Sequence, residues 1–227
     1  NATNEKTEQG GTPLPATQPT TQPASGLVQI SIPAGKPLYI GTPKDVKVDG
    51  PLEKPRKEGE PRRPFLAPPG TVNLAAKRPV TSSEAEPIIG SLDFVTDGDK
   101  EGTEGSYVEL GPNSQWVQID LGKPCEIWGI AVWHYHADPR VYKDVVVQLS
   151  DDPNFITGVT TAYNNDHDNS SGFGLGKAPM YFESHEGKLI ETNGQTKGRY
   201  VRLYSRGSTA GDENRYIEVE VYGIPAK

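Results

Sequence analysis

The stretch DFVTDGDKEGTEGSY, residues Asp93 to Tyr107, gathers five acidic side chains and three glycines within fifteen residues. Carboxylates and backbone carbonyls bent around glycines are the ligands that Ca²⁺ prefers in proteins. Asp and Gly are also the residues that build solvated surface turns. The composition of this stretch therefore leaves two interpretations open, a calcium-binding loop and a plain turn.

The stretch WHYHADPRVY, residues 133–142, carries two imidazoles and a guanidinium. His134 and His136 are two residues apart, so on a strand they point to one face, and Arg140 follows just beyond. Such donors hydrogen-bond the hydroxyls of a sugar, for which an exposed aromatic ring supplies a stacking face. Two such histidines could also chelate Zn²⁺, although the sequence locates no third ligand.

Residues 164–174, NNDHDNSSGFG, form a second polar stretch. Its oxygen and imidazole groups suit a second cation or a hydrogen-bonded glycan, and the same residue types also build solvated loops. The candidates for ligand binding in this stretch are Asn164, Asp166, His167, Asp168 and Asn169. A third loop, SRGSTAGDENRY, adds Arg206, while we interpret its Asn214 and Arg215 as ordinary loop residues.

Catalytic motifs are missing from the sequence, which has no GxSxG, no HExxH and no P-loop. A glycosidase needs two carboxylates on either side of a cleft, and a small sandwich filled by its own core leaves little room for one. We therefore expect a protein that binds a ligand and is not an enzyme.

The amino-acid composition divides the chain in two. Thirteen of the 21 prolines precede residue 71, whereas all three Trp and nine of the ten Tyr lie beyond residue 100, so we expect a C-terminal core. Residues 73–227 hold 14 Lys and Arg against 23 Asp and Glu, a balance that repels phosphate backbones and predicts no nucleic-acid partner. The single cysteine excludes an internal disulfide. No apolar run approaches the roughly 20 residues of a membrane span.

We predict three segments: a Thr-, Pro- and Gln-rich tether at 1–26, an extended segment with short strands and a Pro-rich linker at 27–72, and a folded domain at 73–227. The short β-like runs are Leu27 to Pro33 and Pro37 to Gly41, and Phe65 and Leu66 are the expected anchors of the linker onto the domain. Isolated short strands are marginal in water, so they need a sheet of this chain's own domain or of a neighbouring copy.

Beyond Asn73, short β-runs alternate with turn clusters and helical periodicity is missing, which is typical of an antiparallel sandwich or barrel. The runs are WVQIDLG, EIWGIAVWHYH, DVVVQLS, APMYFES, RYVRLYS and RYIEVEVYG. EIWGIAVW is apolar on both faces, which predicts a central strand covered on both sides. In the last run, alternation predicts that Ile217, Val219 and Val221 lie on one face. Glu218, Glu220 and Tyr222 are then expected on the other face.

Six motifs, NLAAKRPVTSS, VTDGD, WVQIDLG, VVVQLSDDPNF, GRYVRLYS and IEVEVYG, follow one another in an order that resembles the discoidin, or coagulation factor V/VIII C-domain, superfamily. This superfamily includes family 32 carbohydrate-binding modules, and the resemblance spans Asn73 to Gly223. It implies an all-β fold, an eight-stranded antiparallel jelly-roll sandwich of the galactose-binding-like type, here preceded by the extended Pro-rich segment.

The resemblance also implies a structural Ca²⁺ that ties the early loop to the last strand. Carried over by position, its ligands are Phe94, Asp97, Asp99, Ile217 and Glu218. The family usually has Thr or Ser three residues after the second acidic position, where this chain has Gly102 followed by Thr103. Either Thr103 binds through a one-residue bulge, or Gly102 gives only its carbonyl.

Similar sugar-binding modules use a His, an Arg, an Asn and an aromatic ring on their loops. We therefore expect a non-catalytic, calcium-stabilised module that binds a glycan or surface polysaccharide in adhesion, through the loops that hold His134, His136, Arg140 and Asn164–Asn169. We expect it to be extracellular or attached to a bacterial envelope, with its export signal already removed. The alternative is a structural subunit in which residues 27–41 add to the sheet of a neighbouring copy and build a homo-polymeric fibre or lattice.

Overall fold

The computed structural model describes residues 26–38, 46–54 and 60–225. The predicted tether, except Gly26, and most of the predicted run Pro37 to Gly41 lie outside the described residues. Within them the chain is β-structure and turns, with one short 3₁₀ helix, so the all-β prediction is confirmed. In order the elements are β1 Val28–Ile30, β2 Phe65–Ala67, β3 Val72–Asn73, β4 Val80–Ser82, η1 Leu92–Thr96, β5 Val108–Leu110, β6 Gln115–His134, β7 Val146–Ser150, β8 Thr160–Asn164, β9 Lys188–Ser205 and β10 Asn214–Pro225.

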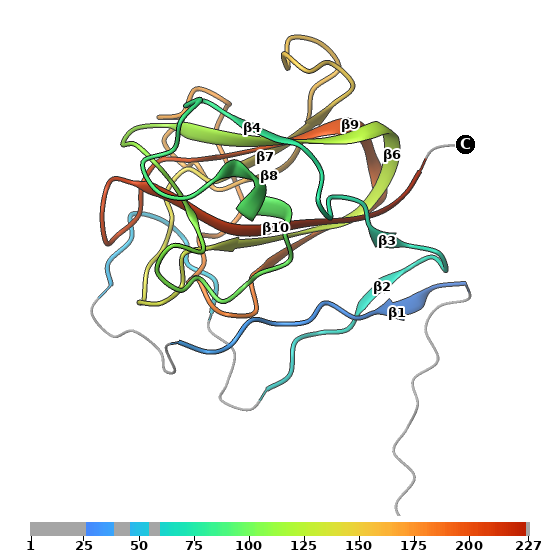
Figure 1. The fold of residues 1–227 in the computed structure, drawn as a ribbon, viewed down its shortest axis with the longest axis horizontal. Coiled ribbons are helices and arrows are strands. Elements are labelled where there is room, and N and C mark those ends of the chain that lie inside the picture. The colour runs from blue at the N-terminus through green and yellow to red at the C-terminus, as the bar shows by residue number, and fades with distance from the viewer. Residues whose placement is uncertain (1–25, 39–45, 55–59, 226–227) are drawn as a thin grey trace, which may run out of the picture.

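The strands β3 to β10 form one antiparallel eight-stranded sheet that folds over into two layers, with β4 in the upper and β10 in the lower layer of Figure 1. The long strands β6 and β9 belong to both layers. The first part of β6 pairs with β4, and its residues 125–134 pair with β10. Register shifts between Asp120 and Cys125 and between Ile127 and Gly129 mark the bend, as β-bulges do. The predicted eight-stranded β-sandwich is confirmed.

The main core lies between the two layers and is built from the alternation of the strands. Val117 and Ile119 of β6, Leu203 of β9 and Val219 and Val221 of β10 are fully buried in it. Fully burying side chains of this size stabilises the fold by about 1.5–3 kcal/mol each. Because these residues recur at every second position, the pleat turns their neighbours to the outer faces.

One residue of the last strand departs from the predicted alternation. Ile217 is buried in a second cluster, on the other side of the sheet from Val219 and Val221. A register shift between Tyr216 and Glu218 inserts one extra residue into β10, and such a bulge reverses the face of everything before it. The prediction that Ile217 shares a face with Val219 and Val221 was therefore wrong.

The second cluster lies on the outer face of the layer that contains β10. The N-terminal segment, with β1 and β2, covers it from outside. β1 pairs with β2 of the same chain, and Phe65 is 3% exposed, with its ring 5.7 Å from that of Tyr222. Trp133 is fully buried in the same cluster. The prediction that EIWGIAVW is a strand covered on both sides is confirmed, and the cover on its outer side comes from this chain.

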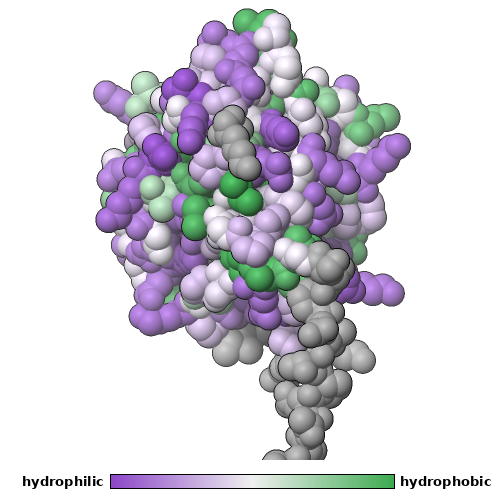
Figure 2. All heavy atoms as spheres, turned by 90° about the vertical axis from the view of Figure 1, so that its right-hand side faces the viewer, coloured by the Kyte–Doolittle hydropathy of each residue, from purple (hydrophilic) through white to green (hydrophobic). Residues whose placement is uncertain are grey.

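The face drawn in Figure 2, which is the right-hand side of Figure 1, carries small apolar patches separated by hydrophilic side chains. None of the helices in the described ranges has the length and apolar character needed to cross a membrane.

Candidate functional site

The acidic loop and the last strand meet, as the sequence predicts. The helix η1 ends at Thr96 and is followed by Asp97, and then by Gly98 with a φ of 97°, a conformation that suits glycine. The N–H of Gly98 donates to Oε2 of Glu218 across 3.0 Å, and the N–H of Asp99 donates to Oδ1 of Asp97 across 2.7 Å. The loop is thus folded around its own carboxylates and held against β10.

The carboxyl group of Glu218 lies in an unfavourable place for a negative charge. Its side chain is fully buried, and Oε1 has no hydrogen-bond partner among the described residues. Burial, and then the nearby charges of Glu220 and Asp97, raise the pKa of Glu218 to about 9. Burial also raises the pKa of Asp97. A buried carboxylate oxygen without a donor needs a proton or a cation, so Asp97 and Glu218 fit a hard cation such as Ca²⁺.

Of the other implied calcium ligands, Phe94 and Gly102 lie near the site, whereas the hydroxyl of Thr103 does not. Phe94 lies in η1, three residues before Asp97 in the chain. Gly102 packs on Ile217 so closely that a Cβ on Gly102 would stand 2.3 Å from Cδ1 of Ile217. Thr103 is exposed, and its hydroxyl lies 3.1 Å from that of Ser106 in a separate turn. The arrangement therefore places Gly102, and not the Thr103 hydroxyl, beside the last strand.

His134, proposed for a sugar-binding loop, lies inside the protein. It is fully buried, with Nδ1 2.9 Å from Oε1 of Glu183 and its ring 4.4 Å from the ring of Tyr142 and 4.7 Å from that of Tyr216. A side chain enclosed in this way packs the end of β6 and does not reach a surface ligand.

His136 and Arg140 are also buried, with 2% and 4% of their surface exposed. His136 places Nε2 2.9 Å from the carbonyl of Lys100, and Arg140 donates two hydrogen bonds of 2.7 Å to Asp138 while stacking over Tyr135. In the part of the chain that the structure describes, neither histidine belongs to a group of three potential metal ligands. We therefore leave His134, His136 and Arg140 out of the candidate site.

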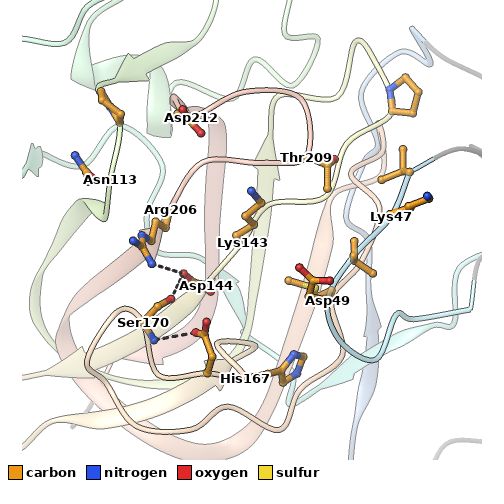
Figure 3. A pocket seen from close by; sticks show the side chains of 16 residues that line it. Lys47, Asp49, Asn113, Lys143, Asp144, His167, Ser170, Arg206, Thr209 and Asp212 are labelled. Carbon is orange, nitrogen blue, oxygen red and sulfur yellow. Dashed lines mark hydrogen bonds and ion pairs between the residues drawn. The ribbon is translucent and has the colours of Figure 1, made fainter.

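A groove of about 970 Å³ opens at the rim of the sandwich and is lined from five parts of the chain (Figure 3). The lining residues are 46–49, then Pro112 and Asn113, then Pro139, Lys143 and Asp144, then His167, Asp168, Ser170 and Met180, and finally Arg206, Thr209 and Asp212. We call this hollow the rim groove. Three of the predicted ligand-binding residues, His167, Asp168 and Arg206, line it.

Asp144 occupies the floor of the rim groove among other charged and polar groups. The hydroxyl of Ser170 donates to Oδ2 of Asp144 across 2.7 Å, and Arg206 lies 3.8 Å from the same oxygen. Carboxylate oxygens of Asp144, Asp166 and Asp168 lie within 4.8 Å of one another. Burial raises the pKa of Asp144, and the two neighbouring carboxylates add to this effect.

The remaining predicted residues of the 164–174 loop hold the loop in shape. Asp166 is fully buried; burial opposes its charge, but hydrogen bonds from Ser171 and from the backbone of Ser170 outweigh that effect and lower its pKa. Asn164 accepts from the N–H of Asp166 across 2.8 Å, and Asn169 accepts from the N–H of Gly174 across 2.6 Å. These side chains position His167 and Asp168 at the groove without lining it.

One wall of the rim groove comes from a segment that sequence reasoning missed. Residues 46–53, which we call the strap, lie along the loop that contains Met180: the N–H of Glu53 donates to its carbonyl, and the N–H of Met180 donates to the carbonyl of Pro51. Lys47 and Asp49 stand across the groove from Arg206 and Ser170 (Figure 3). The alternation in VKVD was the available signal, hidden within a Pro-rich linker.

Comparison with known families gives one match: the F5/8 type C domain model covers residues 79–219. The strap lies outside this matched part. None of the curated proteins matches the chain.

Solved structures that resemble the chain do so at low sequence identity. A family 89 glycoside hydrolase from Clostridium perfringens is 19% identical with a TM-score of 0.49, over 68% of this chain and 15% of the hydrolase. A fucose binding module from Streptococcus pneumoniae is 19% identical with a TM-score of 0.47, over 66% and 97% of the two chains. A fucolectin from striped bass, Morone saxatilis, is 16% identical with a TM-score of 0.48, over 69% and 50%.

The family match agrees with the observed architecture. The matched residues run from the start of β4 into β10 and so include both long strands and the acidic loop. They make up more than half of the 227 residues. The chain therefore belongs to the F5/8 type C domain family.

Proposed function

We propose that the chain is a non-catalytic module that binds a glycan in the rim groove, outside the cell or at the cell envelope, in the service of adhesion. The observation that carries this proposal is the lining of the groove, where hydrogen-bonding and charged side chains of both signs converge from five parts of the chain. Loops at the rim of a rigid sandwich are also where binding residues concentrate. The solved carbohydrate-binding modules and lectins that share the fold are consistent with this role.

The chemistry of the lining suits sugar hydroxyls, each of which both donates and accepts hydrogen bonds. Lys143 and Arg206 offer charged donors, and Asp49 and Asp212 offer charged acceptors. Asn113 offers one of each. Hydrogen bonds to charged groups are about twice as strong as neutral ones, so such a groove orients a polyhydroxylated ligand.

Two carboxylates near the groove support a binding role over a catalytic one. Asp144 accepts a hydrogen bond from Ser170, and Asp166 accepts from both Ser170 and Ser171. Glycoside hydrolysis requires two carboxyl groups on opposite sides of the scissile bond. Asp144, which lines the groove, and Asp166, which lies beside it, are therefore fixed by hydrogen bonds that stabilise the 164–174 loop.

A structural Ca²⁺ at the acidic loop belongs to the same proposal. Asp97 and Glu218 would hold it, with backbone carbonyls of the loop, and its charge would neutralise the buried carboxylate. The support is the unpartnered Oε1 of Glu218 beside Asp97. Stapling the loop to β10 would make the sandwich more rigid and leave recognition to the rim.

The test of glycan binding is a glycan array followed by calorimetric titration of the strongest ligand. We expect Lys143→Ala and Arg206→Ala each to weaken binding about tenfold or more, because each removes a charged hydrogen bond. Lys197→Ala, which removes an exposed lysine outside the groove, should bind as the wild type does. A folded wild-type protein that binds no glycan on the array would overturn the proposal.

The alternative of a homo-polymer formed through residues 27–41 lacks a supporting contact among the described residues. β1 already pairs with β2 of its own chain, and Ile30 and Ile32 pack on the outer cluster of the same domain. The first of the two predicted strands therefore has a partner within this chain, whereas most of the second, Pro37 to Gly41, lies outside the described residues.

A further inference from the structure

A second hollow lies on the outer face of the layer that contains β7 and the second half of β9. It has a volume of about 600 Å³, and four aromatic side chains line it: Trp116, Phe155, Phe173 and Tyr204. We call it the aromatic groove. Trp116 and Tyr204 are paired across β6 and β9, and their neighbours Val117 and Leu203 point into the core, so both rings stand on the outer face.

Arg202 makes this surface rigid. Its guanidinium lies 4.3 Å from the ring of Trp116 and 4.2 Å from the ring of Phe155, between the two. It donates to Oε1 of Gln118 across 2.7 Å and to the carbonyl of Pro153 across 3.0 Å. On the other side of the groove, the rings of Phe173 and Tyr204 lie 4.2 Å apart. The floor and both walls are therefore held in place before any ligand arrives.

The lining of the aromatic groove differs from that of the rim groove. Among the described residues that line it, Arg202 alone is charged, and the contacts above already engage that guanidinium. Ser114 and Gln148 add neutral hydrogen-bonding groups beside the rings. Aromatic faces with a few neutral polar groups suit the apolar face of a pyranose ring. Among the described residues, no Phe, Tyr or Trp lines the rim groove.

The two grooves adjoin along two stretches of the chain. Asn113 lines the rim groove and the next residue, Ser114, lines the aromatic groove. At the end of β9, Tyr204 lines the aromatic groove and Arg206 lines the rim groove. The two residues are two positions apart, which is about 7 Å along an extended chain. A ligand of a few sugar units is long enough to span this separation.

We propose that the aromatic groove is a second sugar subsite continuous with the rim groove, so that the module recognises an oligosaccharide and stacks one of its neutral pyranose rings on the surface formed by Trp116, Phe155 and Phe173. This inference rests on the proposed function of the rim groove. It assigns the charged contacts to one sugar unit and the stacking contacts to a neighbouring unit.

The test is an array printed with galactose, N-acetylglucosamine and mannuronic acid, each as a monosaccharide and as a linear tetrasaccharide, followed by titration. The wild type should bind a tetrasaccharide more tightly than the matching monosaccharide. Phe173→Ala and Phe155→Asn should each weaken tetrasaccharide binding about three- to tenfold, the loss of one aromatic contact, and leave monosaccharide affinity unchanged. Asn suits position 155 because the backbone there has a φ of 55°.

Two exposed neighbours supply matched controls, Leu175→Ala for Phe173→Ala and Ile156→Asn for Phe155→Asn; both lie outside the groove lining. Unchanged monosaccharide affinity also shows that a variant has folded. If the wild type binds both lengths equally, or if the aromatic variants match their controls, the subsite is refuted and the proposed function stands. If the wild type binds no saccharide of either length, the proposed function fails and the subsite with it.

Discussion

The N–H of Gly98 donates to Oε2 of Glu218 across 3.0 Å, although 120 residues separate the two in sequence. The second oxygen of this fully buried carboxyl group has no hydrogen-bond partner among the described residues. Asp97 and Glu220 add negative potential around it. An unpaired charge inside a protein is costly. We therefore expect a cation beside Oε1 of Glu218 to strengthen the hold of Glu218 on the acidic loop.

Calcium should raise the thermal stability of the protein. At a free concentration one hundred times the dissociation constant, a cation that binds only the folded state adds about 2.7 kcal/mol, which amounts to several degrees in the melting temperature. Differential scanning calorimetry with Ca²⁺ and with a chelator measures this shift. In Glu218→Gln the shift should vanish, while Asp93→Asn, which changes an exposed acid of the same loop, should keep it. A wild-type melting temperature that is indifferent to Ca²⁺ would count against the site.

The cover formed by the N-terminal segment should contribute strongly to stability. The backbone of Gly129 leaves room for Phe65, since a Cβ on Gly129 would stand 2.7 Å from Cζ of Phe65. Phe65→Ala should therefore destabilise the protein by about 3–5 kcal/mol in urea unfolding, as loss of a buried ring does. Leu66→Ala, on the same strand but only half-buried, should cost clearly less. Equal costs for the two variants would show that the segment does not pack as described.

The strand content of the domain could be predicted because it follows from short-range alternation. The runs WVQIDLG and EIWGIAVWHYH fall in β6, and RYVRLYS falls in the second half of β9. Their lengths could not be predicted, since the link LGKP reads as a turn but continues β6 through a bulge. APMYFES was predicted as a strand and forms only an isolated bridge between Met180 and Leu52, because the strap offers it one partner residue.

The site was harder to predict because burial depends on contacts between distant segments. His134 and His136 follow an apolar strand and look like loop residues, but Glu183 and the carbonyl of Lys100 enclose them. The Asp97 and Glu218 pair was accessible through the family resemblance, and the structure brings the two acids together. Lys47 and Asp49 gave only the weak signal of the alternation in VKVD, since their place in the rim groove depends on how a Pro-rich segment lies across the loops.

The ion pair of Asp120 with Arg199 should make stability depend on acid pH. Arg199 donates to both oxygens of Asp120 across 2.7 and 2.8 Å, and these hydrogen bonds lower the pKa of Asp120. A carboxyl whose pKa is lower in the folded state stabilises the protein above its unfolded pKa, and this contribution is lost as the pH falls through the folded value.

Asp120→Asn should therefore destabilise the protein modestly from about pH 5 to 8, because both side chains are partly exposed, and the difference from wild type should shrink as the pH falls below the ordinary pKa of Asp. Urea unfolding across this pH range measures it. Arg199→Gln should remove the same energy, and the double variant should lose little more. A difference that grows as the pH falls would contradict the assignment to this pair.

The strap is held against the rim loops at Gly50, where a Cβ would stand 2.4 Å from Nδ1 of His167. That imidazole cannot move freely, because its Nε2 lies 2.9 Å from the carbonyl of Ala178. Gly50→Ala should therefore push the strap away, and with it the wall that carries Lys47 and Asp49. We expect glycan affinity to fall about tenfold, the loss of one charged hydrogen bond. Hydrogen exchange should also quicken at the amides of Glu53 and Met180.

The matched control for this variant is Gly70→Ala. Gly70 also has a positive φ, 89°, but no heavy atom lies within 4 Å of the added Cβ, so this variant has backbone strain without a collision. It should keep the affinity of the wild type and normal exchange at Glu53 and Met180. If Gly50→Ala loses protection at these two amides and still binds glycan as tightly as Gly70→Ala does, the strap covers the loops without contacting the ligand. If both properties change together, a segment outside the F5/8 type C match helps to determine what this module binds.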